Sequence, residues 1–250
     1  MEQKVSLILT TYNSAEHIGE TLNSICMQDY PKIEVIVKDG GSSDDTQDIV
    51  RKYIEDGRLD INFIVQKDSG IYDAMNQGYK YSTGDIISFF NDKFTRKDAV
   101  SLMVDAMNRI NPKTNKSYIG AHADLIYVEG DKVIRNWHMG QGEIRDGWMP
   151  GHPTLYLRRE LYEKYGLFDT SYKISADYDF MIRILKNGNM LAYLPITIIS
   201  MYYGGTSNKS MNSYLESLKE GHRALSVNGV KNSYLVDLKR TFRVIKQFVK

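Results

Sequence analysis

The residues that could carry chemistry lie in short polar clusters, each of which directly follows an apolar run. In chain order the clusters are Thr10-Thr11-Tyr12-Asn13, Asp39-Gly40-Gly41-Ser42-Ser43-Asp44, Lys67-Asp68-Ser69-Gly70 and Asn91-Asp92-Lys93. Their carboxylates can accept hydrogen bonds from a ligand or coordinate a divalent cation. One such cluster alone is equally well explained as a strand–turn–helix connection, because Gly permits a tight turn and Ser or Asp caps the next helix. Four clusters at equivalent positions favour a shared binding site.

The apolar runs alternate with helical patterns in the first part of the chain. Strands are predicted at residues 5–9, 33–37, 61–65 and 86–90. Apolar residues recur at helical spacing within 18–25, 49–54 and 72–81. This alternation predicts an α/β fold, with a Rossmann-like, mostly parallel sheet flanked by helices on both faces. The polar clusters then share the carboxyl edge of the sheet, where open α/β sheets bind their ligands.

After residue 110 the pattern changes to short strands mixed with helices. The predicted strands cover residues 125–128, 133–137 and 154–157, and the predicted helices cover 160–165 and 178–186. We interpret this part as an elaboration that completes the cleft of the first part, and not as an independent domain.

The chain ends in a predicted helical extension, residues 208–250. Its apolar residues form one stripe, with Lys and Arg around it: Leu235, Leu238, Phe242, Ile245 and Phe248 or Val249. A basic amphipathic helix of this kind can lie on an anionic membrane surface. The pattern leaves a second interpretation open, in which the stripe packs on the rest of the chain or on another subunit.

Composition excludes several classes of protein. The chain has 250 residues and a formal net charge of +1, so it lacks the basic field of a nucleic-acid-binding protein. Its single cysteine, Cys26, cannot form an intramolecular disulfide. The N-terminal MEQKVSLILTTYN lacks the long apolar region of a signal peptide, and no run approaches the roughly 18 apolar residues that span a membrane. We therefore expect a cytoplasmic protein.

Two common nucleotide-binding loops are absent from the sequence. No G-x-G-x-x-G opens the first helix and no G-x-x-x-x-G-K-[ST] occurs, which argues against a dinucleotide oxidoreductase and a P-loop enzyme. A nucleotidyltransferase would need a Gly-rich, basic loop after the first strand, where this chain has Thr10-Thr11-Tyr12-Asn13. A nucleotide diphosphate bound without such loops needs another source of positive charge, and a divalent cation held by carboxylates is the usual one.

Taken in order, a set of motifs resembles the family 2 glycosyltransferases of the GT-A fold. The motifs are TTYN, DGGSSDDT, DSGIYDAMNQG, GDIISFFND, GWMPGHPTLYLRRELYEKYGLFDTSYKISADYDFMIRIL and GGTS, and they run from about residue 4 to residue 207. The resemblance implies a GT-A domain over residues 1–207, with a nucleotide-binding half (1–95) and an acceptor-binding, catalytic half (96–207). It further implies an inverting transferase that uses a nucleotide-diphosphate sugar, and the stretch from Gly147 to Leu185 resembles members that assemble bacterial surface polysaccharides.

The resemblance also assigns roles to matching positions. The residues that it implies for substrate binding are Thr11, Tyr12, Asn13, Asp39, Gly70, Asp73, Asn76 and Asn91. Among these, Asp39 matches the aspartate that accepts a hydrogen bond from the base. Asp92 stands in the metal-binding acidic motif, and Asp177 matches the catalytic base. The segment from Gly204 to Ser207 matches a flap near the diphosphate.

The acidic motif departs from the family pattern. Members usually carry two adjacent acids there, in strings such as Asn-x-Asp-Asp, whereas this chain has the shorter Asn91-Asp92-Lys93. Asp92 is then the single carboxylate left to bind Mn²⁺ or Mg²⁺. We expect Lys93 to lie near the diphosphate, where its positive charge replaces part of the charge of the cation. Weak metal binding, or a catalytically degenerate protein that still binds sugar nucleotides, are the alternatives.

The chemistry implied by the resemblance needs one base and one cation that stabilises the charge on the leaving nucleoside diphosphate. An acceptor hydroxyl loses its proton as it attacks the anomeric carbon, and a carboxylate such as Asp177 can take it. A helix start favours the ionised form of that carboxylate, although Asp177 is also a plausible N-cap. His152 is interpreted either as a contact to acceptor or diphosphate or as an ordinary loop histidine. The donor is a UDP-, GDP- or dTDP-sugar, and the acceptor a saccharide or a lipid-linked saccharide.

Overall fold

A computed structural model describes residues 2–112, 114–186, 188–202 and 211–248, without the side chains of 211–212 and 244–248. The strands are β1 (Val5–Thr11), β2 (Ile33–Asp39), β3 (Ile61–Val65), β4 (Ile86–Phe89), β5 (Lys93–Phe94), β6 (Ile110–Asn111), β7 (Lys116–Ser117), β8 (Gly120–Glu129), β9 (Lys132–Trp137), β10 (Tyr156–Arg158) and β11 (Leu191–Tyr202). The helices are α1 (Ile18–Cys26), α2 (Thr46–Asp56), α3 (Ile71–Tyr81), α4 (Ala99–Asn108), α5 (Arg159–Tyr165), α6 (Ala176–Leu185), α7 (Met211–Val227) and α8 (Ser233–Phe248).

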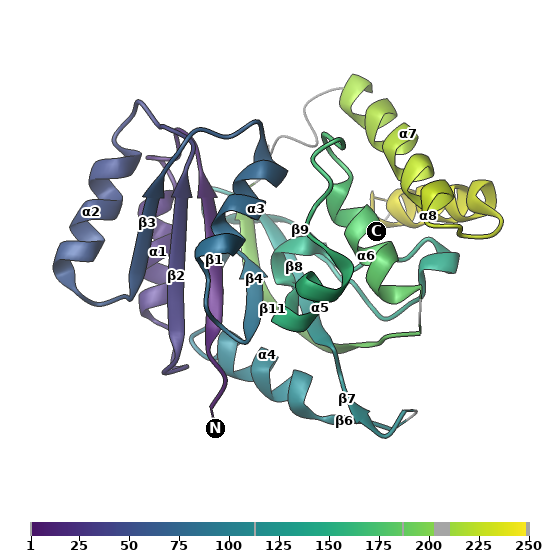
Figure 1. Ribbon diagram of the computed structural model, residues 1–250, viewed down its shortest axis with the longest axis horizontal. Coiled ribbons are helices and arrows are strands. Elements are labelled where there is room, and N and C mark those ends of the chain that lie inside the picture. Colours follow the sequence, from purple (N-terminus) through teal and green to yellow (C-terminus); the bar gives the residue numbers. More distant parts are fainter. Residues whose placement is uncertain (1, 113, 187, 203–210, 249–250) are drawn as a thin grey trace.

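One large twisted sheet organises the molecule (Figure 1). Its strand order is β3-β2-β1-β4-β10-β8-β11-β5, with β9 paired to β8. The four strands of the first half run parallel, as predicted, and the β1–β2 register sets Thr11 directly beside Asp39. The second half is mixed, because β10 runs antiparallel to both β4 and β8 while β8 and β11 are parallel. The predicted α/β fold is confirmed.

The alternation of side chains along the strands builds a core on each face of the sheet. Val5, Leu7 and Leu9 of β1 pack with α1, α2 and α4. Ile8 of β1 and Ile36 of β2 point to the opposite face, where they pack with α3, α5 and α6 and with buried residues of α7 and α8. Helices therefore cover both faces, and the C-terminal helix pair belongs to the same face as α3 and α6 (Figure 1).

Element bounds differ from the sequence prediction in two places that matter for the site. The predicted strand at 154–157 is wrong at its start: His152–Thr154 forms a 3₁₀ turn that includes Pro153, and the Thr154 hydroxyl donates to the Gly151 carbonyl at 3.0 Å. The predicted helix at 178–186 begins two residues earlier, at Ala176, so Asp177 lies in its first turn. The predicted boundary between residues 207 and 208 falls outside the described residues, as does the Gly204–Ser207 segment.

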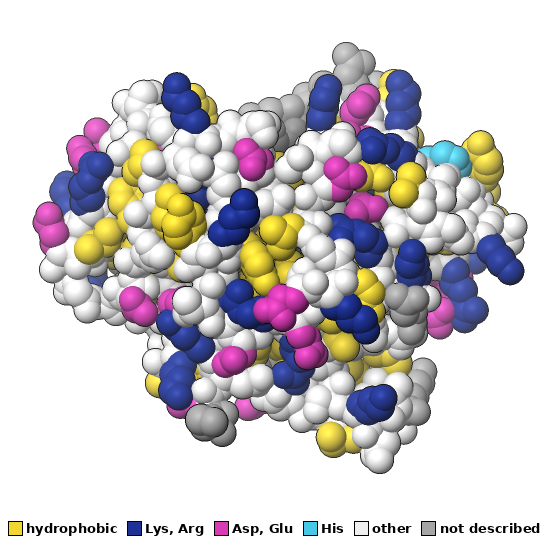
Figure 2. Space-filling view, viewed as in Figure 1, with side chains coloured by type: hydrophobic (Ala, Val, Ile, Leu, Met, Phe, Trp, Pro, Cys, Tyr) yellow, Lys and Arg dark blue, Asp and Glu magenta, His cyan; other side chains and the backbone are white. Residues whose placement is uncertain are grey.

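The C-terminal helix α8 packs through Val236 and basic side chains, and the described part of its apolar stripe is exposed. Lys239 forms a 2.9 Å ion pair with Asp146, and the Arg240 guanidinium lies 4.5 Å from the centre of the Tyr178 ring. Leu235, Leu238 and Phe242 are 50%, 53% and 56% exposed. Figure 2 shows several Lys and Arg side chains on the part of the surface formed by the C-terminal helices. Within the described residues, no helix is both long and apolar enough to cross a bilayer.

Candidate active site

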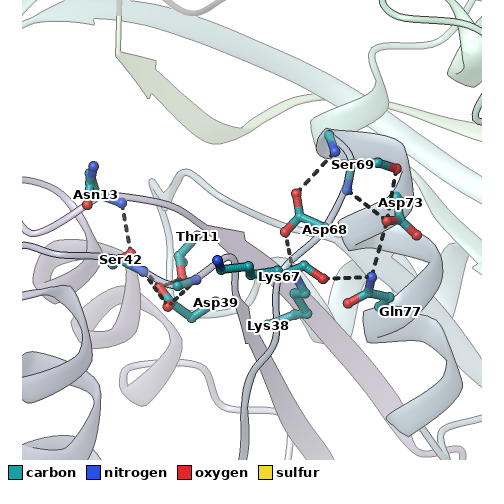
Figure 3. A network of polar contacts seen from close by, with 12 residues as sticks. Thr11, Asn13, Lys38, Asp39, Ser42, Lys67, Asp68, Ser69, Asp73 and Gln77 are labelled. Carbon is teal, nitrogen blue, oxygen red and sulfur yellow. Dashed lines mark hydrogen bonds and ion pairs between the residues drawn. The ribbon is translucent and has the colours of Figure 1, made fainter.

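The Asp39 carboxylate is the centre of a polar network at the ends of β1 and β2 (Figure 3). It is fully buried. One oxygen accepts hydrogen bonds from the backbone N–H groups of Gly41 and Ser42 at 2.9 and 2.8 Å, and the other from the hydroxyls of Ser42 and Thr11 at 2.5 and 3.1 Å. Protein donors thus already satisfy Asp39, and its contact with a nucleotide base stays a prediction.

Asn13 joins the loops that follow β1 and β2. Its backbone adopts the left-handed region, with φ of 49°, which asparagine tolerates better than most residues. Its N–H donates to the Ser42 hydroxyl at 2.8 Å, and its side-chain oxygen accepts from the Ser43 N–H at 2.9 Å. The neighbouring Tyr12 is exposed, with its ring beside Gly40. Together these residues present a continuous surface at the carboxyl edge of the sheet.

A buried ion pair supports the loop that follows β3. Lys38, on β2, has no exposed surface and pairs with Asp68. The other Asp68 oxygen accepts from the Gly70 N–H at 3.1 Å (Figure 3). The sequence analysis gave Lys38 no role, although a lysine next to the apolar run of β2 was a usable signal, since buried lysines are almost always paired.

Gly70, Asp73 and Asn76 all shape α3 and its surroundings. Gly70 has φ of 136°, which favours glycine, and it precedes the first residue of the helix. Asp73 accepts from the Ser69 N–H at 2.9 Å, and this bond lowers the pKa of the Asp73 carboxyl. The Asn76 amide donates to the Phe168 carbonyl and accepts from the Phe168 N–H, at 2.8 and 3.1 Å. Their predicted contacts with nucleotide stay untested.

A pocket of about 340 Å³ opens between the end of β1, the start of α1 and the ends of β4 and β11. Four of the predicted residues line it: Thr11, Asn13, Asn91 and Asp92. The Asn91 amide accepts from the Thr10 N–H at 2.9 Å and donates to the Thr10 hydroxyl at 3.0 Å, which ties β4 to β1. Burial raises the pKa of Asp92 to about 7, because desolvation disfavours its charged form.

His17, Glu20 and Tyr202, which the sequence analysis did not identify, form one wall beside this pocket. The Tyr202 ring stacks on His17 with 3.9 Å between ring centres, and its hydroxyl donates to Glu20 at 2.6 Å. The Lys93 ammonium pairs with the same Glu20 oxygen at 3.1 Å. Lys93 is therefore held at the outer side of the wall and is not among the lining residues of the pocket, and its contact with a diphosphate stays a prediction.

A second polar centre gathers at the start of α6. Asp177 is half-buried there, and its side chain lies 3.1 Å from the Tyr72 hydroxyl. That hydroxyl also contacts the Ile174 carbonyl, so its single proton is shared between two acceptors. Burial, together with the charge of Asp177, raises the pKa of Tyr72, which keeps it protonated and able to donate. Tyr72 is part of the DSGIYDAMNQG string, but nothing in its spacing predicted this contact.

His152 lies close to the same centre. Its ring is 5.8 Å from the ring centres of both Phe89 and Phe168. Burial lowers the pKa of His152, and the charge of Asp177 opposes this only in part. His152 is thus neutral at pH 7. Sequence segments around residues 72, 152 and 177 meet at this place because α3, the 3₁₀ turn and α6 all pack on one face of the sheet.

Other candidate side chains near these centres have structural partners. Asp179 and Arg183 form an ion pair at 2.9 Å. Trp148 and Tyr156 are buried in the core. Arg158 and Arg159 donate to the carbonyls of Tyr118 and Gly84, so neither faces solvent freely.

The fold is a GT-A-type α/β fold, as the likeness to solved structures shows. Staphylococcus aureus TarS 1-349 in complex with UDP-GlcNAc superposes with a TM-score of 0.71 at 21% identity, covering 91% of this chain and 66% of TarS. Mannosyltransferase PcManGT from Pyrobaculum calidifontis, in complex with GDP-Man and Mn²⁺, gives 0.66 at 18% identity, covering 96% of this chain and 74% of that one. These likenesses concern the fold.

Sequence comparison places the chain in a family. The pattern of Glycosyl transferase family 2 matches residues 6–173. The PGL/p-HBAD biosynthesis glycosyltransferase of Mycobacterium bovis is 30% identical over 215 residues, covering 81% of this chain and 78% of that protein. A Methanococcus voltae glucuronosyltransferase that acts on a dolichyl N-acetyl-α-D-glucosaminyl phosphate is 26% identical, with 82% and 68% covered. The chain belongs to glycosyl transferase family 2 and is a glycosyltransferase.

Proposed function

We propose that this glycosyltransferase inverts the anomeric centre of a nucleotide-diphosphate sugar as it transfers the sugar to an acceptor hydroxyl. The observation that carries this proposal is the pair of carboxylates in different surroundings. Asp92 lines the pocket at the end of β4, whereas Asp177 lies at the start of α6 beside a protonated tyrosine and a neutral histidine. A displacement needs positive charge near the leaving diphosphate and a base for the acceptor hydroxyl. In this proposal Asp92 holds the cation that supplies the positive charge, and Asp177 is the base.

Asp177 takes the role of general base. The acceptor oxygen forms a bond to the anomeric carbon as the bond to the nucleoside diphosphate breaks, and the acceptor proton passes to the Asp177 carboxylate. Asp177 lies in the first turn of α6, and the Tyr72 hydroxyl contacts its carboxylate at 3.1 Å. Burial opposes the charged form of His152 beside this carboxylate.

Asp92 is the residue that would hold a divalent cation. Among the described residues, no group of three or more His, Cys, Asp or Glu side chains is placed to hold a metal ion. A single carboxylate still suits Mg²⁺ or Mn²⁺, since such ions in phosphate-transfer sites are bound by one or two carboxylates, waters and the phosphates of the substrate. The raised pKa of Asp92 fits a carboxylate that a cation would neutralise. The cation would stabilise the charge that develops on the leaving diphosphate.

The neighbours suggest the chemical class of the substrates. TarS in complex with UDP-GlcNAc and PcManGT in complex with GDP-Man and Mn²⁺ share this fold. We propose a UDP-, GDP- or dTDP-sugar as donor, bound mainly by residues 1–95, and a saccharide or lipid-linked saccharide as acceptor, bound mainly by residues 96–207. The place of action would be the cytoplasmic side of a bacterial membrane, in the assembly of a surface polysaccharide.

Product analysis tests this function. The purified protein would be incubated with each sugar nucleotide and a panel of saccharide and lipid-linked acceptors, and released nucleoside diphosphate and the anomeric configuration of the product would be measured by NMR. We expect release with one nucleotide class and an inverted product. A retained configuration would contradict the base assigned to Asp177. Binding of a sugar nucleotide without any release would favour the degenerate binding protein.

We also propose that the outward stripe of α8 touches an anionic membrane. Residues 208–250 carry nine Lys and Arg against three Asp and Glu. Leu235, Leu238 and Phe242 are exposed on α8, whereas Val236 is buried and Arg240 packs on the Tyr178 ring. Burial of apolar side chains in the interface, helped by the basic surroundings, would hold the enzyme close to a lipid-linked acceptor.

The double variant Leu238→Glu, Phe242→Glu is expected to weaken binding to vesicles that contain anionic lipid by at least about tenfold, because it removes two apolar contacts and adds two negative charges. Flotation of the full-length chain with such vesicles measures this. Ile110→Glu is the matched control, since Ile110 is 59% exposed on β6, away from α8. Equal flotation of the double variant and the control would contradict membrane contact through α8.

A further inference from the structure

Glu220, on the C-terminal helix α7, caps the segment that leads into α6. One of its carboxylate oxygens accepts from the Lys173 N–H at 2.8 Å, and the other accepts from the N–H groups of Ile174 and Ser175, both at 2.9 Å. Glu220 is buried. Three consecutive N–H groups are therefore satisfied by one charged side chain, and charge-assisted bonds of this kind are stronger than neutral ones. A function of Glu220 in fixing this segment follows directly.

The capped segment carries the proposed base. Ser175 is the residue before α6, and Asp177 is the second residue of the helix. The Tyr72 hydroxyl contacts the Ile174 carbonyl and the Asp177 carboxylate from the other side. The backbone at residues 173–175 is thus held by Glu220 through its N–H groups and by Tyr72 through one carbonyl. A shift of this backbone would move Asp177 with it.

The position of Glu220 is itself fixed by α8. The Arg240 guanidinium lies over the ring of Tyr178, the residue after Asp177, and donates to the Ser217 hydroxyl of α7 at 3.4 Å. Gly221, next to Glu220, leaves the space that the guanidinium fills, since a Cβ at this position would meet it. The C-terminal helix pair therefore packs around the start of α6.

We propose that Glu220 is a positioning residue for glycosyl transfer, which holds Asp177 at the distance and angle that proton abstraction needs. This inference rests on the proposed function of Asp177 as the base. It gives Glu220 of α7 a role in positioning the base, separate from any membrane contact of α8. A misplacement of about 1 Å at a reacting group can lower a rate about 100-fold. The proposed donor site lies mainly in residues 1–95, whereas Glu220 bonds residues 173–175, so sugar nucleotide binding is expected to remain intact.

Steady-state kinetics of Glu220→Gln test the proposal. Glutamine keeps the size of the side chain but presents an NH₂ group to one of the three N–H donors and lacks the charge. We expect kcat to fall about 10- to 100-fold, while the donor KM and the thermal shift caused by the donor stay within about twofold. Glu216→Gln, one turn earlier on α7, is the matched control and is expected to leave kcat unchanged. Glu220→Asp, which keeps the charge but withdraws it, is expected to give an intermediate kcat if Glu220→Gln does not fold.

A double-mutant cycle with Asp177→Asn separates positioning from general stability. If Glu220 acts through Asp177, Glu220→Gln lowers kcat in the wild-type background and has no further effect in the Asp177→Asn background. Equal losses in both backgrounds, or an unchanged kcat in Glu220→Gln, would overturn the positioning role. An unchanged kcat in Asp177→Asn would instead overturn the proposed base, so the two failures are distinguishable.

Discussion

Asp177→Asn is expected to lower kcat by about 10²- to 10⁴-fold and to leave the donor KM within about twofold, because general-base catalysis contributes a factor of this size. Asparagine matches aspartate in shape, and its side-chain oxygen can still accept the hydrogen bond from Tyr72. The variant therefore removes the base while it preserves the local packing. Initial rates at saturating acceptor, with donor varied, measure both constants.

A variant of the neighbouring Tyr72 is expected to have a smaller effect on kcat than Asp177→Asn. Tyr72→Phe deletes the hydroxyl that contacts Asp177 and the Ile174 carbonyl but leaves the carboxylate in place. Its kcat should fall by less than that of Asp177→Asn. If Asp177→Asn keeps more than about one tenth of the wild-type kcat, Asp177 is not the base.

Asp92→Asn is expected to lower kcat/KM by about 10²- to 10³-fold, the usual loss when one group that stabilises the developing charge is removed. The same variant should lose the response of the wild type to added Mn²⁺ or Mg²⁺. Activity measured across a metal titration checks both points. Wild-type-like activation by metal in Asp92→Asn would show that Asp92 is not a ligand.

The pH dependence of stability gives an independent test of Asp92. Burial raises the pKa of its carboxyl in the folded protein to about 7, whereas an aspartate in an unfolded chain titrates near ~3.9. The folded state therefore binds the extra proton, and stability falls as the pH rises between these two values. Asp92→Asn removes this loss of stability. In EDTA, the melting temperature of Asp92→Asn should therefore be higher than that of the wild type, and the difference should be larger at pH 8 than at pH 5.

Asp105→Asn is the control for that experiment, because Asp105 is an exposed residue of α4. It should change the melting temperature little at either pH. If Asp92→Asn melts at a lower temperature than the wild type at pH 8, the charged Asp92 carboxylate does not destabilise the folded protein, and the prediction is contradicted.

The first half of the fold was predictable because its local sequence patterns favour the same strands and helices that the packing of the folded protein requires. The strands β1, β2 and β4 are largely apolar runs of a sheet buried on both faces, and the intervening helices carry apolar residues at helical spacing. Prediction was less accurate at residues 154–157, where a turn with Pro153 precedes β10. The direction of β10 was not predictable either, because it depends on pairing with β4 and β8, which are distant in sequence.

The candidate site was predictable only in part, for the same reason. Thr11, Asn13, Asn91 and Asp92 share one pocket because they end adjacent strands, which the alternating pattern implies. The bonds from Asn76 to Phe168 and from Glu220 to residues 173–175 join helices and loops that are far apart in the chain, and no local pattern encodes them. The stripe of α8 was recognised, but its outward direction follows from the packing of Val236 and Arg240 on the other side of the helix.

Binding of a sugar nucleotide to the full chain is the most direct test of the central claim. Melting temperatures would be recorded with UDP-, GDP- and dTDP-sugars, each with and without Mn²⁺ or Mg²⁺. A ligand at 100 times its dissociation constant adds about 2.7 kcal/mol of stability, and a chain of this size gains about 2–4 °C for each kcal/mol. We predict a rise of about 5–10 °C with one nucleotide class, larger with metal, and loss of the metal effect in Asp92→Asn. No rise with any sugar nucleotide, with or without metal, would contradict the proposed transferase function.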